Sequence, residues 1–501
     1  MSEIRRENSK SIARNVIHNF SSWILPLVLS FIATPYIVRL LGHEDYGIYS
    51  LAISFIAYSF NFNVGRAITK YVAEYRVRNE SEKISEVISA TLFINLSIGG
   101  FGLIAIVSLA NVLASYVLKI PPESHDKTVQ ALYIAALTIF FLMLFQLFTA
   151  ILQGVHRFDV TAKINNVNNI LLISGNLALA LAGFGLLALL LWNLLVTVYS
   201  MIAAAFAAKR LLPEFTLNLK FRRETLIQVF KYSSGVIAYQ LLANILLLFE
   251  RSWITGRLGA ESLTFYVVPM MLAIYIHGFF ANLISVVFPL VSELKHEPEK
   301  LLRLYQKATK TVAFLAIFIG ATLMVESRHF LTLWMGADFA EKSTSVLILL
   351  TLTFTFLAIK IVSWQLAEGL GYPNYNSYFY MLCFIISIFG MVWLINDYGN
   401  FGVAIARAVG FGVLFLSTFY VEKLFLGKIQ VKFWLRLFGI LAVSTALAVA
   451  VESYLSAKLG LSWVSLIVSG LSGGVVYCVT AWLMGFVSDD EIALVKGILK
   501  R

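Results

Sequence analysis

Long apolar runs separated by short polar turns occupy most of this 501-residue chain. Fourteen of these runs are long enough to cross a lipid bilayer, which takes about 20 residues in a helix. Inside the bilayer the backbone has to satisfy its own hydrogen bonds, so runs of this length form helices and not open sheets. The pattern predicts an all-α, polytopic membrane protein with about fourteen transmembrane helices, near residues 16–39, 47–69, 87–116, 129–152, 160–182, 185–208, 228–250, 262–289, 308–325, 344–367, 375–395, 401–421, 433–453 and 462–486.

The composition agrees with lipid as the solvent for most of the chain. Hydrophobic residues make up 59% of it, charged residues 13%, and the mean hydropathy is +0.81. A soluble domain carries about 45–50% apolar and roughly 25% charged residues. Cys383 and Cys478 both lie inside apolar runs, which excludes a disulfide framework and a cysteine-based zinc site. The first run follows a basic segment and lacks a small-residue cleavage site, so we expect a membrane helix and not a removable signal peptide.

The basic residues predict the orientation in the membrane. If the N-terminus is cytoplasmic, the inner segments hold 28 of the 39 Lys and Arg residues and the outer turns hold 8. Positive charge accumulates on the cytoplasmic side of membrane proteins, and we therefore expect both termini to be cytoplasmic. The net charge of +11 needs no nucleic-acid partner to explain it. The basic inner loops are also suited to contact anionic lipid headgroups.

Two pairs of short segments suggest an internal duplication. RLLGHEDYGIYS (39–50) aligns with LGAESLTFY (258–266) at an offset of 217 residues, and ILQGVHRFD (151–159) aligns with LAEGLGYPN (366–374) at an offset of 215. Each offset spans six helices, and an even number predicts parallel repeats related by an axis along the membrane normal. We therefore expect a six-helix lobe, a cytoplasmic linker, a second six-helix lobe, and a C-terminal helix pair with a cytoplasmic tail, at residues 1–208, 209–226, 227–421 and 422–501.

Three basic residues inside the predicted helices are the first candidates for a binding site: Arg66, Lys360 and Arg407. Charged residues are costly in lipid and usually face an aqueous cavity. Acids such as Glu250 and Glu326 lie at predicted helix ends, where we expect water to solvate them. A cavity with cations and no acids suits an anionic ligand. The alternative is that Lys360 extends toward an interface and that Arg407 lies near the outer end of its helix.

Side-chain amides form the second group of candidates. Asn165 and Asn169 lie near the start of the fifth predicted helix, and Asn244 lies in the seventh. Amides can hydrogen-bond sugar hydroxyls without imposing a charge. The alternative, which is favoured for any single asparagine, is a hydrogen bond that joins two membrane helices. The chain has no Walker loop, no HExxH and no GxSxG motif, so we expect no enzyme, no metal site and no cofactor.

Four segments resemble the signatures of polysaccharide biosynthesis flippases: RLLGHEDYGIYSLA (39–52), KYVAEYR (70–76), ILQGVHRFDVTAKINNVNNIL (151–171) and VVFPLVSEL (286–294). These are the Wzx-type O-antigen exporters of the multidrug/oligosaccharidyl-lipid/polysaccharide (MOP) superfamily. The resemblance implies an inner (plasma) membrane protein with two MATE-like lobes around a central cavity. It also implies export of a polyprenyl-diphosphate-linked oligosaccharide to the outer leaflet by alternating access, for O-antigen, capsule or exopolysaccharide synthesis. The implied partners are that lipid-linked oligosaccharide, membrane lipids, and a polysaccharide polymerase or other assembly proteins.

Three alternatives stay open. Drug–cation exporters of the same superfamily typically carry an acid in the first helix, and this chain has none between Glu7 and Glu44. Lipid II flippases carry arginines within that helix, whereas no basic residue lies between Arg14 and Arg39. The third alternative is a membrane scaffold of a polysaccharide assembly complex that transports nothing itself.

Overall fold

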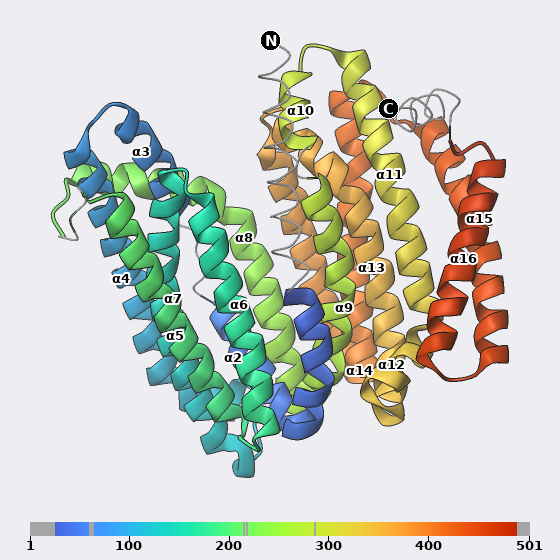
Figure 1. The fold of residues 1–501 in the computed structure, drawn as a ribbon, viewed down its shortest axis with the longest axis horizontal. Helices are drawn as coiled ribbons and strands as arrows, with labels where there is room; N and C mark the ends of the chain where they lie inside the picture. The colour runs from blue at the N-terminus through green and yellow to red at the C-terminus, as the bar shows by residue number, and fades with distance from the viewer. Residues whose placement is uncertain (1–25, 60–64, 214–215, 217–218, 285–286, 488–501) are drawn as a thin grey trace. The chain divides into compact units, whose positions relative to one another are not determined.

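The computed structural model describes residues 26–59, 65–213, 216, 219–284 and 287–487 (Figure 1). Within these residues every regular element is a helix. Ten helices in this described part of the chain are long and apolar enough to cross a membrane. One of them, α14 (Pro373–Phe425), consists of two helices that meet at Gly399, where φ is 55° and ψ is −137°. The predicted all-α, multi-pass membrane fold is confirmed. The basic N-terminal segment, the start of the first predicted helix and the tail after residue 487 lie outside the described residues.

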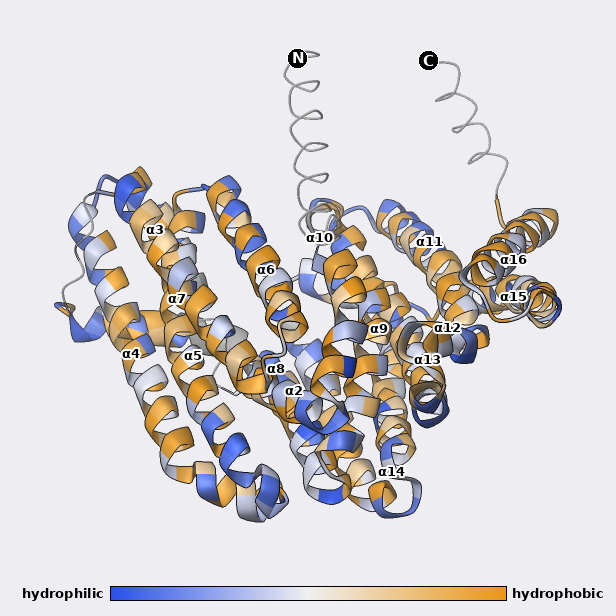
Figure 2. Ribbon diagram, turned by 60° about the horizontal axis from the view of Figure 1, so that its bottom comes forward, coloured by the Kyte–Doolittle hydropathy of each residue, from blue (hydrophilic) through white to orange (hydrophobic). Residues whose placement is uncertain are grey.

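Most of the helices follow the predicted apolar runs and several extend beyond them, whereas the short helix at Ser327–Met335 lies between two predicted runs. In the first part of the chain they are Pro26–Leu41, α2 (His43–Tyr58), α3 (Gly65–Val77), α4 (Ser81–Val112) with the π-helical turn η1 (Leu113–Val117), α5 (Pro122–Gly154), α6 (Phe158–Leu181), α7 (Leu186–Leu211) and α8 (Arg223–Leu258). They continue with α9 (Ala260–Ile284), α10 (Val287–Glu293), α11 (Pro298–Val325), α12 (Ser327–Met335), α13 (Ala337–Gly369), α14, α15 (Val431–Leu459) and α16 (Trp463–Leu483). Hydropathy detects only the part of a helix that lies in lipid. It therefore misses helical turns that contain charged residues, such as 298–307 at the start of α11. Figure 2 shows hydrophilic residues concentrated at helix ends and hydrophobic residues along the helices.

By its packing the chain divides into two compact units, Met1–Thr264 and Phe265–Arg501. Helix α8 belongs with the first unit because it packs against α2, α3 and α4. Helix α7 ends at Leu211 and α8 begins at Arg223, so the predicted linker is helical at both of its ends. The predicted lobe boundaries at 208 and 227 stay a prediction.

Each unit is built around one long, mostly buried helix. Helices α5 and α13 both contain 33 residues. In their most apolar 18-residue stretches, 61% and 67% of the residues are buried, the highest shares among the ten candidate spans of the described residues. In the first unit α5 packs against α2, α3, α4 and α7, and in the second α13 packs against α10, α11, α12 and α14. Helix α5 begins at Pro122 and ends at Gly154. Helix α13 begins at Ala337 and ends at Gly369, in both cases 215 residues later. Their bounds therefore repeat the offset of 215 that the sequence predicts.

The two glycine turns of the first repeated motif have the same backbone conformation. Gly42 has φ 81° and ψ 161°, and Gly259 has φ 88° and ψ 164°. This region of φ and ψ is open essentially to glycine alone. The amide of Gly42 donates to the carbonyl of Val38 at 2.9 Å, and the amide of Gly259 donates to that of Thr255 at 3.0 Å. The sequence match therefore reflects one turn used twice.

The second motif also repeats as a structure. After α5 the backbone amides of residues 155, 156 and 157 donate to the carbonyls of 151, 153 and 152, and after α13 the amides of 370, 371 and 372 donate to 366, 368 and 367. Both turns contain a residue at positive φ, His156 at 60° and Gly371 at 91°. The hydrogen bonds and the positive φ values recur at the offset of 215, which supports parallel repeats.

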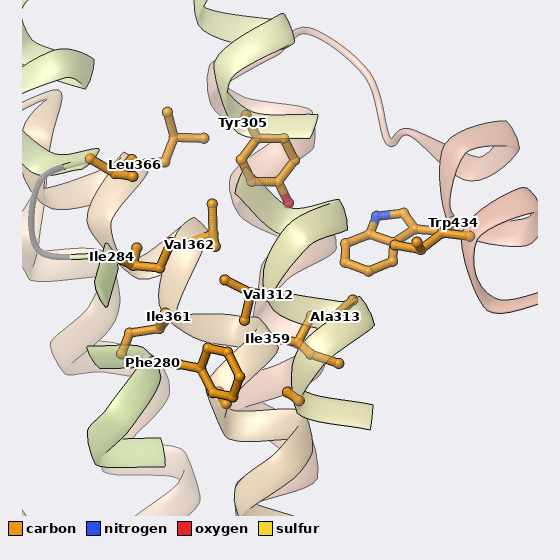
Figure 3. Packing of buried hydrophobic residues seen from close by; sticks show 14 of the residues in the cluster. Phe280, Ile284, Tyr305, Val312, Ala313, Ile359, Ile361, Val362, Leu366 and Trp434 are labelled. Atoms are coloured by element: carbon orange, nitrogen blue, oxygen red, sulfur yellow. The ribbon is translucent and has the colours of Figure 1, made fainter. Parts of the chain in front are cut away.

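The core of the second unit lies where α9, α11, α13 and α15 meet (Figure 3). Phe280 and Ile284 come from α9, Val312 from α11, Val362 from α13 and Trp434 from α15. Lipid tails are as apolar as these side chains, so helix association here depends on close packing and interhelical hydrogen bonds more than on a hydrophobic driving force. Polar contacts between helices therefore have unusual weight in this fold.

Candidate functional site

Lys360 lies on the central helix α13 and is only 1% exposed. Its ammonium donates to the hydroxyl of Ser363 at 3.0 Å, and that hydroxyl lies 3.1 Å from the hydroxyl of Thr418 on α14. The ring centroid of Trp364 is 5.7 Å from the ammonium. Lys360 is thus held inside the second unit by hydroxyl groups and an aromatic face, and it does not extend to an interface.

Arg407 is also 1% exposed, on the second half of α14. Its guanidinium carbon lies 5.0 Å from the ring centroid of Phe411, within cation–π distance. Helices α13 and α14 pack against each other, so both predicted cations belong to one helix pair. A buried charge needs polar or aromatic partners inside the protein. Both of these buried cations lie on α13 and α14, in the second unit.

The other four predicted site residues belong to the first unit. Asn165 is exposed on α6, Asn169 is half-buried on the same helix, and Asn244 is buried on α8. Arg66 is the second residue of α3, and its side chain lies outside the described part of the structure. Neither unit alone brings all six predicted residues together.

The structure also contains a buried polar cluster that the sequence does not predict. The Asn176 amide donates to the Tyr49 hydroxyl and to the side-chain oxygen of Asn193, both at 3.0 Å, and Asn193 donates to the same hydroxyl at 3.3 Å. The three residues come from α6, α2 and α7. The one available signal is that Asn176 lies six residues before the 182–185 turn and Asn193 eight residues after it, on the two arms of one helical hairpin. The cluster joins three helices of the first unit.

The expectation that Glu250 and Glu326 are solvated by water is wrong. Glu250 is 0% exposed and Glu326 is 4% exposed. The carboxylate of Glu326 accepts from the hydroxyls of Ser456 at 2.9 Å and Ser469 at 3.0 Å. Those donors come from α15 and α16, more than 100 residues further along the chain. Hydrogen bonds from neighbouring helices thus replace the expected water.

A second buried acid holds the same helices together. Glu452 on α15 is 1% exposed and accepts from the Thr322 hydroxyl of α11 at 2.9 Å. Opposite it on α16 lies Gly473, where an added Cβ would stand 2.1 Å from Oε1 of Glu452. The C-terminal helix pair is therefore attached to α11 by carboxylates as well as by apolar contacts.

The two glycine turns of the first motif meet each other. We call this contact, residues 42–54 against 251–264, the corner seam. An added Cβ on Gly47 would stand 1.8 Å from the carbonyl oxygen of Ala260. The Thr264 hydroxyl donates to the carbonyl of His43 at 2.6 Å, and Nδ1 of His43 lies 3.9 Å from Glu261. The absence of a side chain at Gly47 allows the backbones to approach this closely.

The acidic residues of the motif attach α2 to α5. Glu44 accepts from the Ser124 hydroxyl at 2.6 Å, and Asp45 pairs with the ammonium of Lys127 at 2.7 Å. On the other side of the seam the Arg251 guanidinium of α8 donates to the Ser54 hydroxyl. These contacts explain why charged residues and glycines cluster in 39–50.

Comparison with known proteins identifies the family. Residues 36–344 match the family model described as polysaccharide biosynthesis protein. The chain belongs to this family. It is 21% identical over 410 residues to the "Putative O-antigen transporter" of Shigella flexneri, and the match covers 80% of this chain and 94% of the relative.

Solved structures share the fold of this family member. The lipid II flippase MurJ in an inward closed conformation matches with a TM-score of 0.74 and 15% identity, over 93% of this chain and 97% of that one. An inward-facing multidrug resistance MATE family transporter of the MOP superfamily matches with a TM-score of 0.68 and 16% identity, over 82% and 98%. A MOP superfamily transporter from Pyrococcus furiosus matches with a TM-score of 0.60 and 16% identity, over 82% and 94%. The predicted MOP-like fold is confirmed, and so is the predicted polysaccharide biosynthesis family.

Proposed function

We propose that this protein moves a polyprenyl-diphosphate-linked oligosaccharide from the cytoplasmic to the outer leaflet of the plasma membrane, for surface polysaccharide synthesis. The observation that carries the proposal is the family match over residues 36–344. The MOP transporter fold and the relative described as an O-antigen transporter support it. A diphosphate and a sugar chain cannot enter hydrocarbon unaided, because burial of an unpaired charge is very costly. A protein path for the head group, with the polyprenyl tail left in lipid, removes this cost.

In this proposal basic residues neutralise the diphosphate. Lys360, Arg407 and Arg66 are the candidates for phosphate contacts, and Asn165, Asn169 and Asn244 are the candidates for contacts with sugar hydroxyls. The ammonium of Lys360 is bonded to the Ser363 hydroxyl, and phosphate oxygens are stronger acceptors than that hydroxyl. Because Lys360 is enclosed, the helices around it have to part before a ligand reaches it.

Transport by alternating access requires a gate that opens toward each side of the membrane. We assign the outer gate to the corner seam, because its turns lie on the side that the distribution of basic residues predicts to be outside. The small contact at Gly47 and Ala260 would part when the head group leaves. With the cell interior negative, each net negative charge moved outward gains roughly 2.3 kcal/mol per 100 mV. The membrane potential thus favours export.

Reconstitution tests the proposal directly. The purified protein is placed in vesicles that contain a lipid-linked oligosaccharide, and a glycosidase added outside measures how much of the lipid is accessible. We expect the accessible fraction to rise from about half to nearly all only when the protein is present. Vesicles with lipid II test the alternative substrate. Restored surface polysaccharide in cells without movement of the lipid in vesicles would favour the scaffold alternative.

The proposed orientation has a separate test. Single cysteines replace Glu44 in the corner seam and Lys220 in the linker, in a background without Cys383 and Cys478. Both positions are exposed, so a membrane-impermeant thiol reagent reaches either one from its own side. In intact cells we expect labelling at 44 and none at 220 until the cells are broken. The reverse pattern would overturn both the orientation and the direction of export.

A further inference from the structure

A cavity of about 350 Å³ opens between α11, α15 and the residues that follow α16. Three basic side chains line it, Lys310 from α11 and Lys432 and Arg436 from α15. Its other walls are mainly apolar and consist of Phe433, Leu437, Ile440 and Phe486 beside Gln306 and Gly485. Within the described part of the chain no carboxylate lines this cavity. We call it the basic cavity.

The order of residues along α15 separates charge from apolar surface. The helix begins at Val431, so Lys432 and Arg436 lie in its first two turns, while Leu437 and Ile440 follow toward the middle of the apolar span. Basic residues at the end of a membrane helix lie at the level of lipid headgroups. A molecule in this cavity would therefore meet cations at one end and hydrocarbon-like side chains at the other.

Arg436 and Lys432 are the two residues of the basic cavity best suited to bind an anion. The Arg436 guanidinium donates to the carbonyl of Gly485 at 3.0 Å, which leaves most of its five N–H donors for a ligand. The ammonium of Lys310 lies 4.7 Å from the ring centroid of Phe486. Lys432 is exposed at the rim. Together they place three positive charges around one opening.

A carboxylate near the end of α14 is bonded elsewhere. Glu422 accepts from the Tyr305 hydroxyl at 2.8 Å, from the Trp434 indole at 2.7 Å and from the backbone amide of Gln430 at 2.8 Å. All three donors are neutral, and they use both oxygens of the carboxylate. Glu422 therefore stabilises the turn between α14 and α15 and is not an ion-pair partner for the basic cavity.

We propose that the basic cavity binds the phosphate group of a membrane lipid, with the hydrocarbon chain of the lipid lying against Phe433, Leu437 and Ile440. The volume lies within the range of about 300–1,000 Å³ of small-molecule sites, and basic pockets between membrane helices bind anionic headgroups. Two lipids carry this chemistry, an anionic phospholipid and a polyprenyl diphosphate. The inference requires only that the chain lies in a membrane, so it stands whether or not the protein transports oligosaccharide.

Lipid titration of the purified full chain by native mass spectrometry tests this site. Phosphatidylglycerol, phosphatidylcholine and a polyprenyl diphosphate are added separately to wild type, to K432Q/R436Q and to K423Q/K428Q. The last variant is the matched control, because it removes two exposed charges, one at the end of α14 and one in the turn after it, and neither residue lines the cavity. We expect the wild-type protein to bind phosphatidylglycerol and the polyprenyl diphosphate more tightly than phosphatidylcholine, because the choline cation compensates the phosphate charge of phosphatidylcholine. We expect K432Q/R436Q to bind them roughly 30-fold more weakly, and the control to change less than threefold.

The two lipid arms identify the source of the phosphate. A larger loss for the polyprenyl diphosphate than for phosphatidylglycerol assigns the cavity to the carrier lipid, and equal losses assign it to anionic lipids in general. Unchanged affinity of K432Q/R436Q for both lipids overturns the proposal, as does an equal loss in the control. If the double variant does not purify, K432Q alone gives the same comparison, since that side chain is exposed. Transport by these variants is measured separately, so failure of the lipid site and failure of the proposed function are distinguishable.

Discussion

The corner seam makes a sharp prediction for Gly47→Ala. The new Cβ would stand 1.8 Å from the carbonyl oxygen of Ala260. The contacting group is backbone, so no flexible side chain can move away. Since atoms in contact prefer about 3.5 Å, the two segments have to separate by roughly 1.7 Å. We expect the substitution to favour an open seam.

The cost of closing the seam follows from two contributions. Overpacking in a well-packed interface costs about 1–3 kcal/mol. A separation of this size also lengthens the bond from the Thr264 hydroxyl to the His43 carbonyl, now 2.6 Å, beyond hydrogen-bond range, which costs about 1 kcal/mol more. The sum of about 2–4 kcal/mol raises the ratio of open to closed seam by roughly 30- to 1,000-fold.

A buried thiol beneath the seam measures this ratio. Ser54 is 0% exposed and contacts Arg251 across the seam, so a cysteine at position 54 is protected while the seam is closed. In a background without the native cysteines Cys383 and Cys478, we expect the Gly47→Ala variant to react with a small methanethiosulfonate reagent faster by that same factor. The rate is measured on purified protein below saturation of the reagent.

Gly100→Ala is the matched control. Gly100 also lies inside a helix, α4, but an added Cβ there would meet nothing within 4 Å. Both variants gain about 1 kcal/mol of helix propensity, so the difference between them isolates the clash. Equal and slow labelling of position 54 in the two variants would refute the close contact at Gly47. Fast labelling already in the parent protein would refute the buried position of Ser54.

Two further substitutions test the buried polar contacts. Replacing Lys360 with Gln removes the enclosed charge. We expect surface polysaccharide per unit of membrane-inserted protein to fall at least tenfold, because the loss of one charged contact costs about 1.4 kcal/mol or more, which corresponds to a factor of about ten. Arg78→Gln, at an exposed i,i+4 pair with Glu74, should leave export unchanged, and normal export from the Lys360 variant would remove this residue from the proposed path. Gly473→Ala places a Cβ 2.1 Å from the Glu452 carboxylate and should lower Tm, whereas Gly439→Ala meets nothing within 4 Å and should not; equal melting of the two would contradict the packing of α15 on α16.

Local chemistry explains what was predictable from the chain alone. A bilayer demands internally satisfied backbone hydrogen bonds, so apolar length by itself determines where most membrane helices lie. A turn that needs positive φ restricts its residue to glycine or a few others, which is why Gly42 and Gly259 mark the repeat. Both requirements act within a few residues, and both are visible in the sequence.

The tertiary structure decided which polar groups meet. Glu326 is bonded to Ser469, 143 residues away, and Tyr49 to Asn176, 127 residues away. A carboxylate solvated by water at a helix end and one that accepts hydrogen bonds from hydroxyls of another helix have the same local sequence pattern. Which partner it has depends on which helices pack together. The sequence by itself determined the helices, the family and the repeated turns. Only helix packing decided that Lys360 is enclosed, that Gly47 touches Ala260, and that three basic residues surround one cavity.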